Sequence, residues 1–176
     1  MKTCILVANE DEAKHILPIL AKKKNTQIII VGEGRSNVLR NISEKLKDGT
    51  IGPEDNIINI GYVGANGYKK SDIVHVKKVN HLFPSKTIYE PSLTLKTINT
   101  SYPIVHCYTA DNFVNKEDIN LKDLCIIDME LYYIALMFPN VISFKIVSDE
   151  LNYEDYKEAN FEDAWEKARK IIKDIL

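Results

Sequence analysis

The stretch CIIDMELYYIALMFPNVISFKIVSD, residues 125–149, predicts a strand, a helix and a second strand in succession. It opens on a short β-branched run, continues as an apolar segment of helical length up to Pro139, and closes on the apolar run Val141 to Val147. In a parallel α/β sheet, ligands bind at the carboxyl ends of the strands. Glu130 and Asp149 follow the two strands, so we expect both carboxylates to face one ligand site.

The same acids have a second interpretation. Asp128 or Glu130 can be an acid in the first turn of a helix, where exposed amides and the helix dipole favour negative charge. Asp149 can likewise cap the segment that follows its strand. The residues of this stretch alone leave both interpretations open.

Length and composition predict one globular domain over residues 1–176, long enough to bury a core. Hydrophobic residues make up 45% of the chain and charged residues 27%, as in ordinary globular proteins. The net charge of −2 provides no basic field for a nucleic acid backbone. No apolar run approaches the ~20 residues of a membrane span, and Met1-Lys2 leads directly into a strand. We therefore expect a cytoplasmic protein with neither nucleic acid nor membrane as a partner.

Cysteine and histidine spacing indicates neither a disulfide framework nor a metal site. The three cysteines are odd in number, far apart and next to strand-like runs, which predicts buried thiols. None of the four histidines has metal-ligand spacing, so we interpret them as structural and expect no metal and no cofactor. The residues concerned are Cys4, Cys107, Cys125, His15, His75, His81 and His106.

The first predicted strand, Lys2 to Ala8, ends in a group of acids. Asn9 and the run Glu10-Asp11-Glu12 follow it, and apolar residues then recur at helical spacing up to Leu20. The purely structural interpretation of the three acids is that they begin a helix, because a helix N-terminus favours negative charge. The other interpretation places one of them at the ligand site.

Two glycine-rich segments follow the next two predicted strands. The turn Gly32 to Asn37 leads into a helix from Val38 to about Lys47, and the corner Gly61 to Gly67 follows the strand Asn56 to Ile60. The first resembles a dinucleotide-binding loop, but its third glycine is absent and no strand end precedes the acids 20 residues on. Both segments predict close approach of the backbone to another group.

The middle of the chain contains one clearly predicted strand and one segment for which the sequence predicts no definite structure. Residues 81–100 are polar and β-leaning, with two prolines. A strand from Ile104 to Tyr108 follows, and then a polar turn from Thr109 to Val114 that carries Phe113. Phe113 can be an ordinary core residue, or it can stack on a planar ligand from its strand-end loop. Residues 150–158 are predicted as a loop, and Phe161 to Leu176 as an amphipathic helix.

These strand-end motifs, taken in chain order, resemble those of one enzyme family. The chain resembles the nucleoside phosphorylase/nucleosidase family, and most closely the methylthioadenosine/S-adenosylhomocysteine nucleosidases. The likeness covers nearly the whole length, with residues 81–100 shortened. The motifs are Glu12, residues 32–37, residues 59–64, residues 111–114, Met129-Glu130 and Ser148-Asp149.

The resemblance implies a three-layer α/β/α sandwich with a central mixed β-sheet, and cleavage of the bond between a purine and ribose. Asp149 matches the acid that protonates the purine at N7, with Ser148 orienting it. Glu130, after Met129, matches the carboxylate that holds the ribose hydroxyls. Glu12 matches the residue that activates the attacking water. These residue types suit the reaction, which needs an acid at the leaving group and anions beside an oxocarbenium-like sugar.

The same resemblance assigns the substrate contacts. Phe113 matches the ring that stacks on the base, and the backbone near Val114 matches the segment that reads the base edge. Gly61, in the second glycine-rich segment, is also expected to bind the substrate. By family analogy the chain is expected to form a homodimer.

Three positions depart from the family pattern. Lys145 stands where the nucleosidases usually have an arginine, and it keeps the charge but loses the planar fork. Tyr62 replaces a small residue, and Asn9 replaces an apolar residue of the pocket for the 5′-alkylthio group. We expect all three residues near the substrate. The sequence does not identify the 5′ group of that substrate.

Three functions stay open on the sequence: a nucleosidase that uses water, a phosphorylase that uses phosphate, and a nucleoside-binding protein without turnover. Phosphorylases of this fold resemble one another in holding phosphate with several arginines on early loops. The chain has only Arg35, Arg40 and Arg169, of which Arg35 alone is expected near the site. We therefore predict a hydrolase that acts on a purine nucleoside.

Overall fold

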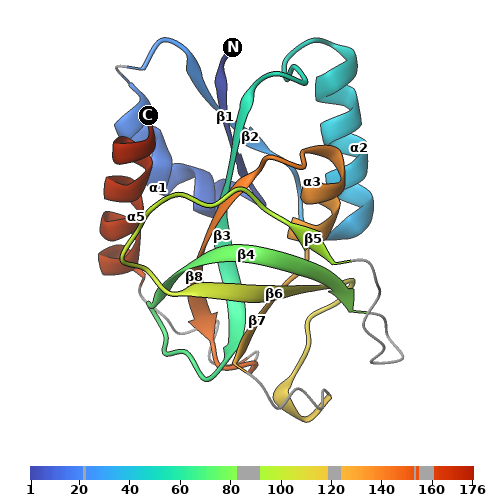
Figure 1. The fold of residues 1–176 in the computed structure, drawn as a ribbon, viewed down its shortest axis with the longest axis vertical. Helices are drawn as coiled ribbons and strands as arrows, with labels where there is room; N and C mark the ends of the chain where they lie inside the picture. The colour runs from blue at the N-terminus through green and yellow to red at the C-terminus, as the bar shows by residue number, and fades with distance from the viewer. Residues whose placement is uncertain (22, 83–91, 119–123, 153, 155–160) are drawn as a thin grey trace.

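The computed structural model describes residues 1–176 except residues 22, 83–91, 119–123, 153 and 155–160. Strands and helices alternate from β1 to β3, several strands follow, and a helix closes the chain (Figure 1). The strands are β1 (Thr3–Val7), β2 (Thr26–Ile30), β3 (Asn56–Asn66), β4 (Ile73–Leu82), β5 (Leu93–Thr94), β6 (Ile104–Ala110), β7 (Cys125–Asp128) and β8 (Ile142–Asp149). The helices are α1 (Glu10–Leu20), α2 (Gly34–Lys47), the 3₁₀ turn η1 (Lys116–Asp118), α3 (Leu131–Met137) and α5 (Glu162–Ile175).

The described strands form one eight-stranded mixed sheet. β2, β1 and β3 are parallel neighbours in that order. β3 also pairs with β8 in parallel and with β7 in antiparallel orientation, and β4 pairs with β8 and β6. Because β6 pairs in turn with β7, the strands β3, β8, β4, β6 and β7 close into a ring. The sheet is therefore open on the β1–β2 side and curled on the other.

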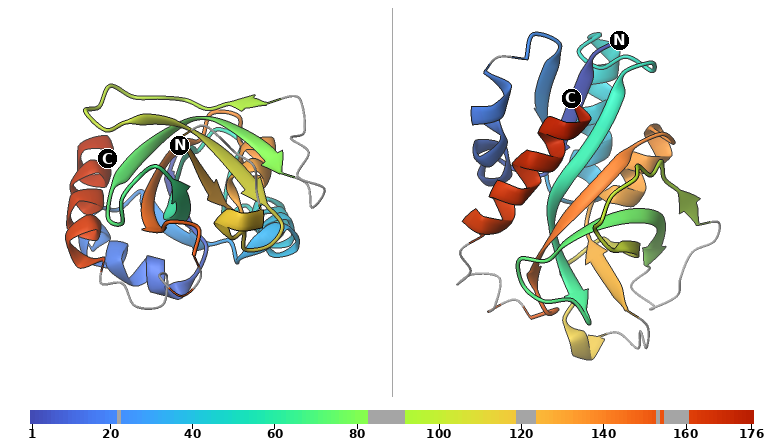
Figure 2. Two further views of the ribbon diagram at one scale, coloured as in Figure 1. Left: turned by 90° about the horizontal axis from the view of Figure 1, so that it is seen from below. Right: turned by 60° about the vertical axis from the view of Figure 1, so that its left-hand side comes forward.

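Helices cover the sheet in two separate layers. Figures 1 and 2 show α1 and α5 side by side on one flank and α2 and α3 on the other. Trp165 of α5 packs with Phe144 of β8 in one buried cluster, and Val38 of α2 packs with Leu131 of α3 in the other. The predicted three-layer α/β/α architecture with a central mixed sheet is confirmed.

The glycine segment Gly61 to Gly67 is not a corner, as the sequence predicted, but the continuation of β3. Its backbone pairs with β8 as far as Gly64 and then with β7 as far as Asn66. Glycine is needed at these positions because side chains from other elements occupy the space that a Cβ atom would take. A Cβ on Gly61 would lie 2.6 Å from Glu12 Oε1, and one on Gly64 would lie 2.9 Å from Asp149 Oδ1. The expected close approach exists, and its partners are acidic side chains.

Other boundaries shift by a few residues. α2 begins at Gly34 rather than Val38, and β8 includes Asp149 as its last residue. Of the segment 81–100, the structure describes the end of β4 and the short strand β5, while residues 83–91 lie outside the described part. Most of the predicted loop 150–158 lies outside it as well.

The three cysteines are buried free thiols, as predicted. Among the described residues, the helices are too short or too polar to cross a membrane.

Candidate active site

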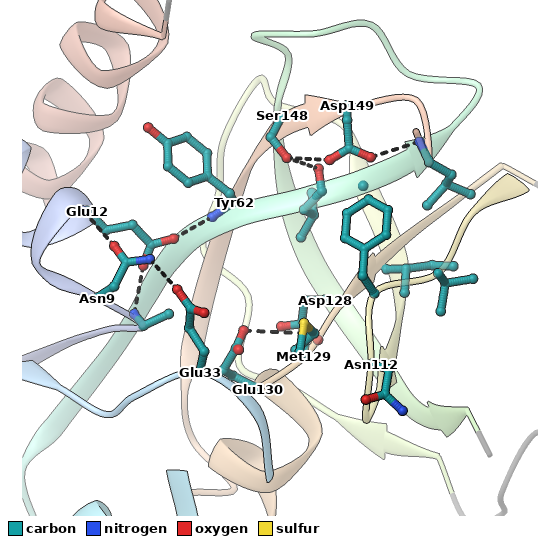
Figure 3. Close-up of a pocket in the computed structure, with 17 residues that line it drawn as sticks. Asn9, Glu12, Glu33, Tyr62, Asn112, Asp128, Met129, Glu130, Ser148 and Asp149 are labelled. Carbon is teal, nitrogen blue, oxygen red and sulfur yellow. Dashed lines mark hydrogen bonds between the residues drawn. The ribbon is translucent and has the colours of Figure 1, made fainter. Parts of the chain in front are cut away.

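A cavity of about 360 Å³ lies where β1, β7 and β8 end, beside the middle of β3 (Figure 3). Its volume falls in the range of about 300–1,000 Å³ that is usual for small-molecule sites. Glu12, Glu130 and Asp149 all line it, although they are far apart in the sequence. The structure therefore brings the three predicted catalytic carboxylates together.

Glu12 belongs to the first turn of α1, but its carboxylate points back over β1 and β3. Oε2 accepts the backbone N–H of Ala8 at 2.7 Å, and Oε1 accepts that of Tyr62 at 2.8 Å. Asn9 caps the helix instead, because its Oδ1 accepts the N–H of Glu12 at 3.0 Å. Burial raises the pKa of Glu12, and the Tyr62 amide and Lys145 oppose that shift. A buried carboxyl of this kind suits proton transfer better than helix capping.

Glu130 follows β7 and is held by backbone amides. Oε1 accepts the N–H of Gly34, the first residue of α2, at 3.0 Å, and Oε2 lies 3.3 Å from the N–H of Met129. Its side chain thus fills the anion position at the start of a 14-residue helix from another part of the chain. Burial, with the nearby charge of Asp128, raises the pKa of Glu130 to about 8, against the lowering effect of Lys145.

Asp128, and not Glu130, makes the helix cap that the sequence left open. Its Oδ2 accepts the N–H of Leu131 in α3 at 2.9 Å, and the same oxygen lies 2.7 Å from Lys145 Nζ. Thr109 Oγ1 donates to its other oxygen. Asp128 lines the cavity but is already satisfied by protein groups.

Lys145 lies behind the cavity and is not among the residues that line it. It is 1% exposed and pairs with Asp128. Burial would lower the pKa of Lys145, but the charges of Asp128 and Glu130 outweigh burial and raise it. Lys145 was expected to contact the substrate, but here its ammonium group is paired with Asp128 and does not reach the cavity lining. Gly61 also stays outside the lining, where it makes room for Glu12.

Asp149 and Ser148 form a hydrogen-bonded chain at the end of β8. Ser148 Oγ lies 2.7 Å from Asp149 Oδ2 and 3.0 Å from the carbonyl oxygen of Val63. The N–H of Leu151 donates to Asp149 Oδ1 at 2.9 Å. Ser148 Oγ donates to Asp149 Oδ2, and because a hydroxyl carries one proton, it shares that proton with the Val63 carbonyl oxygen. The carboxyl group of Asp149 is thus held by Ser148 on one oxygen and by the Leu151 amide on the other.

The predicted base contacts lie on the loop after β6. Phe113 and Val114 both line the cavity, and Phe113 is 37% exposed. Val114 packs against the small apolar cluster that contains Leu151. Met129 also lines the cavity. One exposed aromatic ring on a cavity wall is available to stack on a planar ligand.

Tyr62, which was expected near the substrate, lines the cavity and also contacts the closing helix. Its backbone holds Glu12, while its hydroxyl accepts a hydrogen bond from Trp165 Nε1 at 2.6 Å. The ring packs with Phe161 at a centroid distance of 4.9 Å. The extra bulk of Tyr62 is thus used to attach α5 to β3.

Glu33 lines the cavity and was not among the predicted site residues. Its Oε1 accepts a hydrogen bond from Asn9 Nδ2 at 2.8 Å. The available signal was a carboxylate placed between two glycines, Gly32 and Gly34, at a strand end. From the sequence, only the backbone of that turn was expected close to a ligand.

The cavity is strongly acidic. Five of the described lining residues are Asp or Glu and none is Lys or Arg, so Lys145 behind Asp128 provides the adjacent positive charge. Such a site favours neutral or cationic ligands and opposes anions. The carboxylates are Glu12, Glu33, Asp128, Glu130 and Asp149.

Solved structures of bacterial nucleosidases share this fold. A 5′-methylthioadenosine/S-adenosylhomocysteine nucleosidase from Helicobacter pylori aligns with a TM-score of 0.78 and 13% identity, over 99% of this chain and 97% of that chain. Futalosine hydrolase from the same species gives 0.77 and 14%, over 98% and 96%. The MTAN of Chlamydia trachomatis gives 0.74 and 19%, over 99% and 97%.

No protein-family model matches the chain, and no curated protein matches it in sequence. At identities below one in five, the structural likeness shows the fold. That fold is the one of the nucleoside phosphorylase/nucleosidase family, as the sequence motifs predicted.

Proposed function

We propose that residues 1–176 form a single nucleosidase domain, which hydrolyses the N-glycosidic bond of a purine nucleoside to the free base and a ribose derivative. The observation that carries this proposal is the Val63–Ser148–Asp149 hydrogen-bond chain, which faces Glu12 and Glu130 in one cavity. An acid at one side and further carboxylates at the other are the groups that this reaction requires. The solved nucleosidases of the same fold support it, including a C. trachomatis MTAN variant bound to MTA.

In the proposed mechanism, Asp149 donates a proton to N7 of the purine as the bond between C1′ and N9 breaks. The bonding electron pair then remains on a neutral base, which is a better leaving group. Ser148 holds the acid in place, and Phe113 stacks on the ring.

The other two carboxylates act on the sugar. Glu130 accepts hydrogen bonds from the ribose hydroxyls, and Glu12 takes a proton from the water that attacks C1′. The raised pKa of Glu12 makes its carboxylate a stronger base than an exposed glutamate. The negative charge of Glu12, as the base, also stabilises the oxocarbenium-like sugar of the transition state.

Water is the proposed nucleophile because the described residues that line the cavity offer phosphate no cation. Arg35 is exposed and lies over the ring of Tyr133, outside the lining residues. A phosphate beside the site carboxylates would meet like charges, each costing on the order of 4 kcal/mol at an effective dielectric near 20. This argues against the phosphorylase alternative.

The test is to incubate the protein with adenosine or methylthioadenosine, with and without phosphate, and to quantify adenine and the sugar product. We expect free adenine and a reducing sugar at a rate independent of phosphate. Sugar 1-phosphate in proportion to added phosphate would establish a phosphorylase instead. Binding without any product would leave only a nucleoside-binding protein.

Asp149→Asn is the matched inactive variant. It keeps the shape of the side chain but cannot act as the acid, so kcat should fall at least ~100-fold while nucleoside binding persists. Asp163→Asn, at an exposed position of α5, is the control and should keep full activity. Near wild-type turnover in Asp149→Asn would remove Asp149 from the mechanism.

A cytoplasmic homodimer remains part of the proposal by family analogy. Light scattering of the purified protein measures the oligomeric state.

A further inference from the structure

Asn9 and Glu33 form a polar bridge at the edge of the cavity, between the starts of α1 and α2. Asn9 Nδ2 donates to Glu33 Oε1 at 2.8 Å, while Asn9 Oδ1 accepts the N–H of Glu12. Glu33 occupies the N-cap position of α2, yet its side chain makes no capping hydrogen bond. Its carboxylate is therefore turned to the cavity instead of serving its own helix.

The bridge lies at the end of the cavity away from the proposed acid. Figure 3 shows Asn9, Glu12 and Glu33 at one side, Ser148 and Asp149 at the other, and Glu130 between them in that view. A nucleoside with its base at Asp149 and its hydroxyls on Glu130 turns C5′ away from the base. The 5′ substituent then meets the bridge.

The bridge can accept a further hydrogen bond. Among the described residues, Glu33 Oε2 accepts no hydrogen bond, and Asn9 already uses its own oxygen on Glu12. A hydroxyl or amine at C5′ can donate to Glu33. A thioether has no donor and would displace water from the carboxylate without replacing its hydrogen bonds. A 5′-phosphate would add an anion to a cavity that already holds five carboxylates.

We infer that the Asn9–Glu33 bridge selects nucleosides whose 5′ substituent donates a hydrogen bond, a hydroxyl or an amine, over thioethers and over anionic 5′ groups. This inference rests on the proposed nucleosidase function. Glu33 is a specificity-determining residue here, and it takes no part in breaking the glycosidic bond.

The test compares kcat/KM for adenosine, 5′-amino-5′-deoxyadenosine, methylthioadenosine and adenosine 5′-monophosphate. Wild-type protein should prefer the first two over methylthioadenosine by about 10-fold, the low end for a charged hydrogen bond because Glu33 is exposed. The monophosphate should not be cleaved. In Glu33→Leu the adenosine to methylthioadenosine ratio should fall by about the same factor.

The ratio separates selectivity from any general loss of activity, since damage to the site lowers both rates. Glu33→Gln keeps an acceptor oxygen but removes the charge, so its adenosine to methylthioadenosine ratio should be intermediate. Among the substrates, the 5′-amino compound should show the largest fall in kcat/KM in this variant. Glu44→Leu, an exposed change in the same helix, should leave all ratios unchanged. Cleavage of adenosine and methylthioadenosine with equal kcat/KM, or an unchanged ratio in Glu33→Leu, would overturn the inference and leave the nucleosidase proposal intact. Absence of cleavage of every nucleoside would overturn both.

Discussion

Glu130 illustrates how the fold changes the chemistry of a single residue. An isolated glutamate is ionised at neutral pH, whereas burial beside Asp128 raises the pKa of Glu130 to about 8. The Gly34 amide and Lys145 act in the opposite direction but do not cancel burial. Glu130 is thus poised to change its protonation state near neutral pH, in contact with the proposed ribose position.

This shift predicts a pH-dependent stability with a definite sign. Between pH 4.5 and about 8, folded Glu130 holds a proton that the unfolded chain has released. The stability it contributes is complete below pH 4.5 and is lost as the pH rises through about 8. Relative to Glu130→Gln, the wild-type protein should therefore lose free energy of unfolding from pH 5 to pH 8, by up to about 1.4 kcal/mol per pH unit. Urea unfolding of both proteins across this range measures it.

Glu44→Gln is the control for removing one carboxylate, because Glu44 is exposed and does not line the cavity. Its free energy of unfolding should change with pH in the same way as that of the wild-type protein. A Glu130→Gln curve that is also parallel to wild type would contradict the raised pKa.

At the scale of elements, β3 is the strand on which the site is assembled. It pairs with β1, β7 and β8, and it contacts Glu12 through Tyr62 and Ser148 through Val63. Gly61 and Gly64 leave the space that the carboxylates of α1 and β8 occupy. The strand therefore positions the proposed catalytic carboxylates through its backbone and through the space that its glycines leave.

Gly61→Ala tests this role of β3. The new Cβ would lie 2.6 Å from Glu12 Oε1, so the carboxylate must move from the Tyr62 amide. We expect turnover to fall at least ~10-fold, since loss of a positioned acid–base group costs 10²-fold or more and displacement removes part of that. Circular dichroism should show a retained fold.

Gly52→Ala is the matched control, because its Cβ would have no neighbour closer than 3.5 Å. This variant should keep wild-type turnover. Full activity in Gly61→Ala would mean that Glu12 does not need its present position.

At the scale of the whole molecule, the Lys145–Asp128 pair joins β7 and β8, which each pair with β3 rather than with one another. The pair also connects the cavity wall to the cap of α3. Its two side chains are almost completely buried. Removing one partner leaves an unpaired charge inside the curled sheet.

Lys145→Met should therefore lower the free energy of unfolding by about 3–5 kcal/mol, the usual cost of breaking a buried ion pair. Chemical denaturation of wild type and variant measures the difference. Lys173→Met, at an exposed position of α5, should change it by less than ~0.5 kcal/mol. A similarly small change in Lys145→Met would show that Asp128 does not depend on its partner.

The sequence alone predicted most of the element types and singled out three carboxylates, Glu12, Glu130 and Asp149, that the structure places around one cavity. Apolar runs of strand and helix length fixed β1, β7, α3, β8 and α5 to within a few residues, because these patterns depend on local periodicity. Glu130 and Asp149 were expected at one ligand site because each marks the end of a predicted strand at the same edge of the sheet. Glu12 was distinguished from its acidic neighbours Glu10 and Asp11 only by the family resemblance.

Tertiary structure decided what depends on neighbours from distant parts of the chain. The glycines of β3 resembled a turn because the carboxylates that require them are 49 and 85 residues away in the sequence. Lys145 was expected at the substrate, but Asp128 of another strand occupies it. Glu33 was not expected in the site, yet it lines the cavity and accepts a hydrogen bond from Asn9. Local patterns record which face of an element is buried, whereas only the packed chain determines which side chain fills the space beside it.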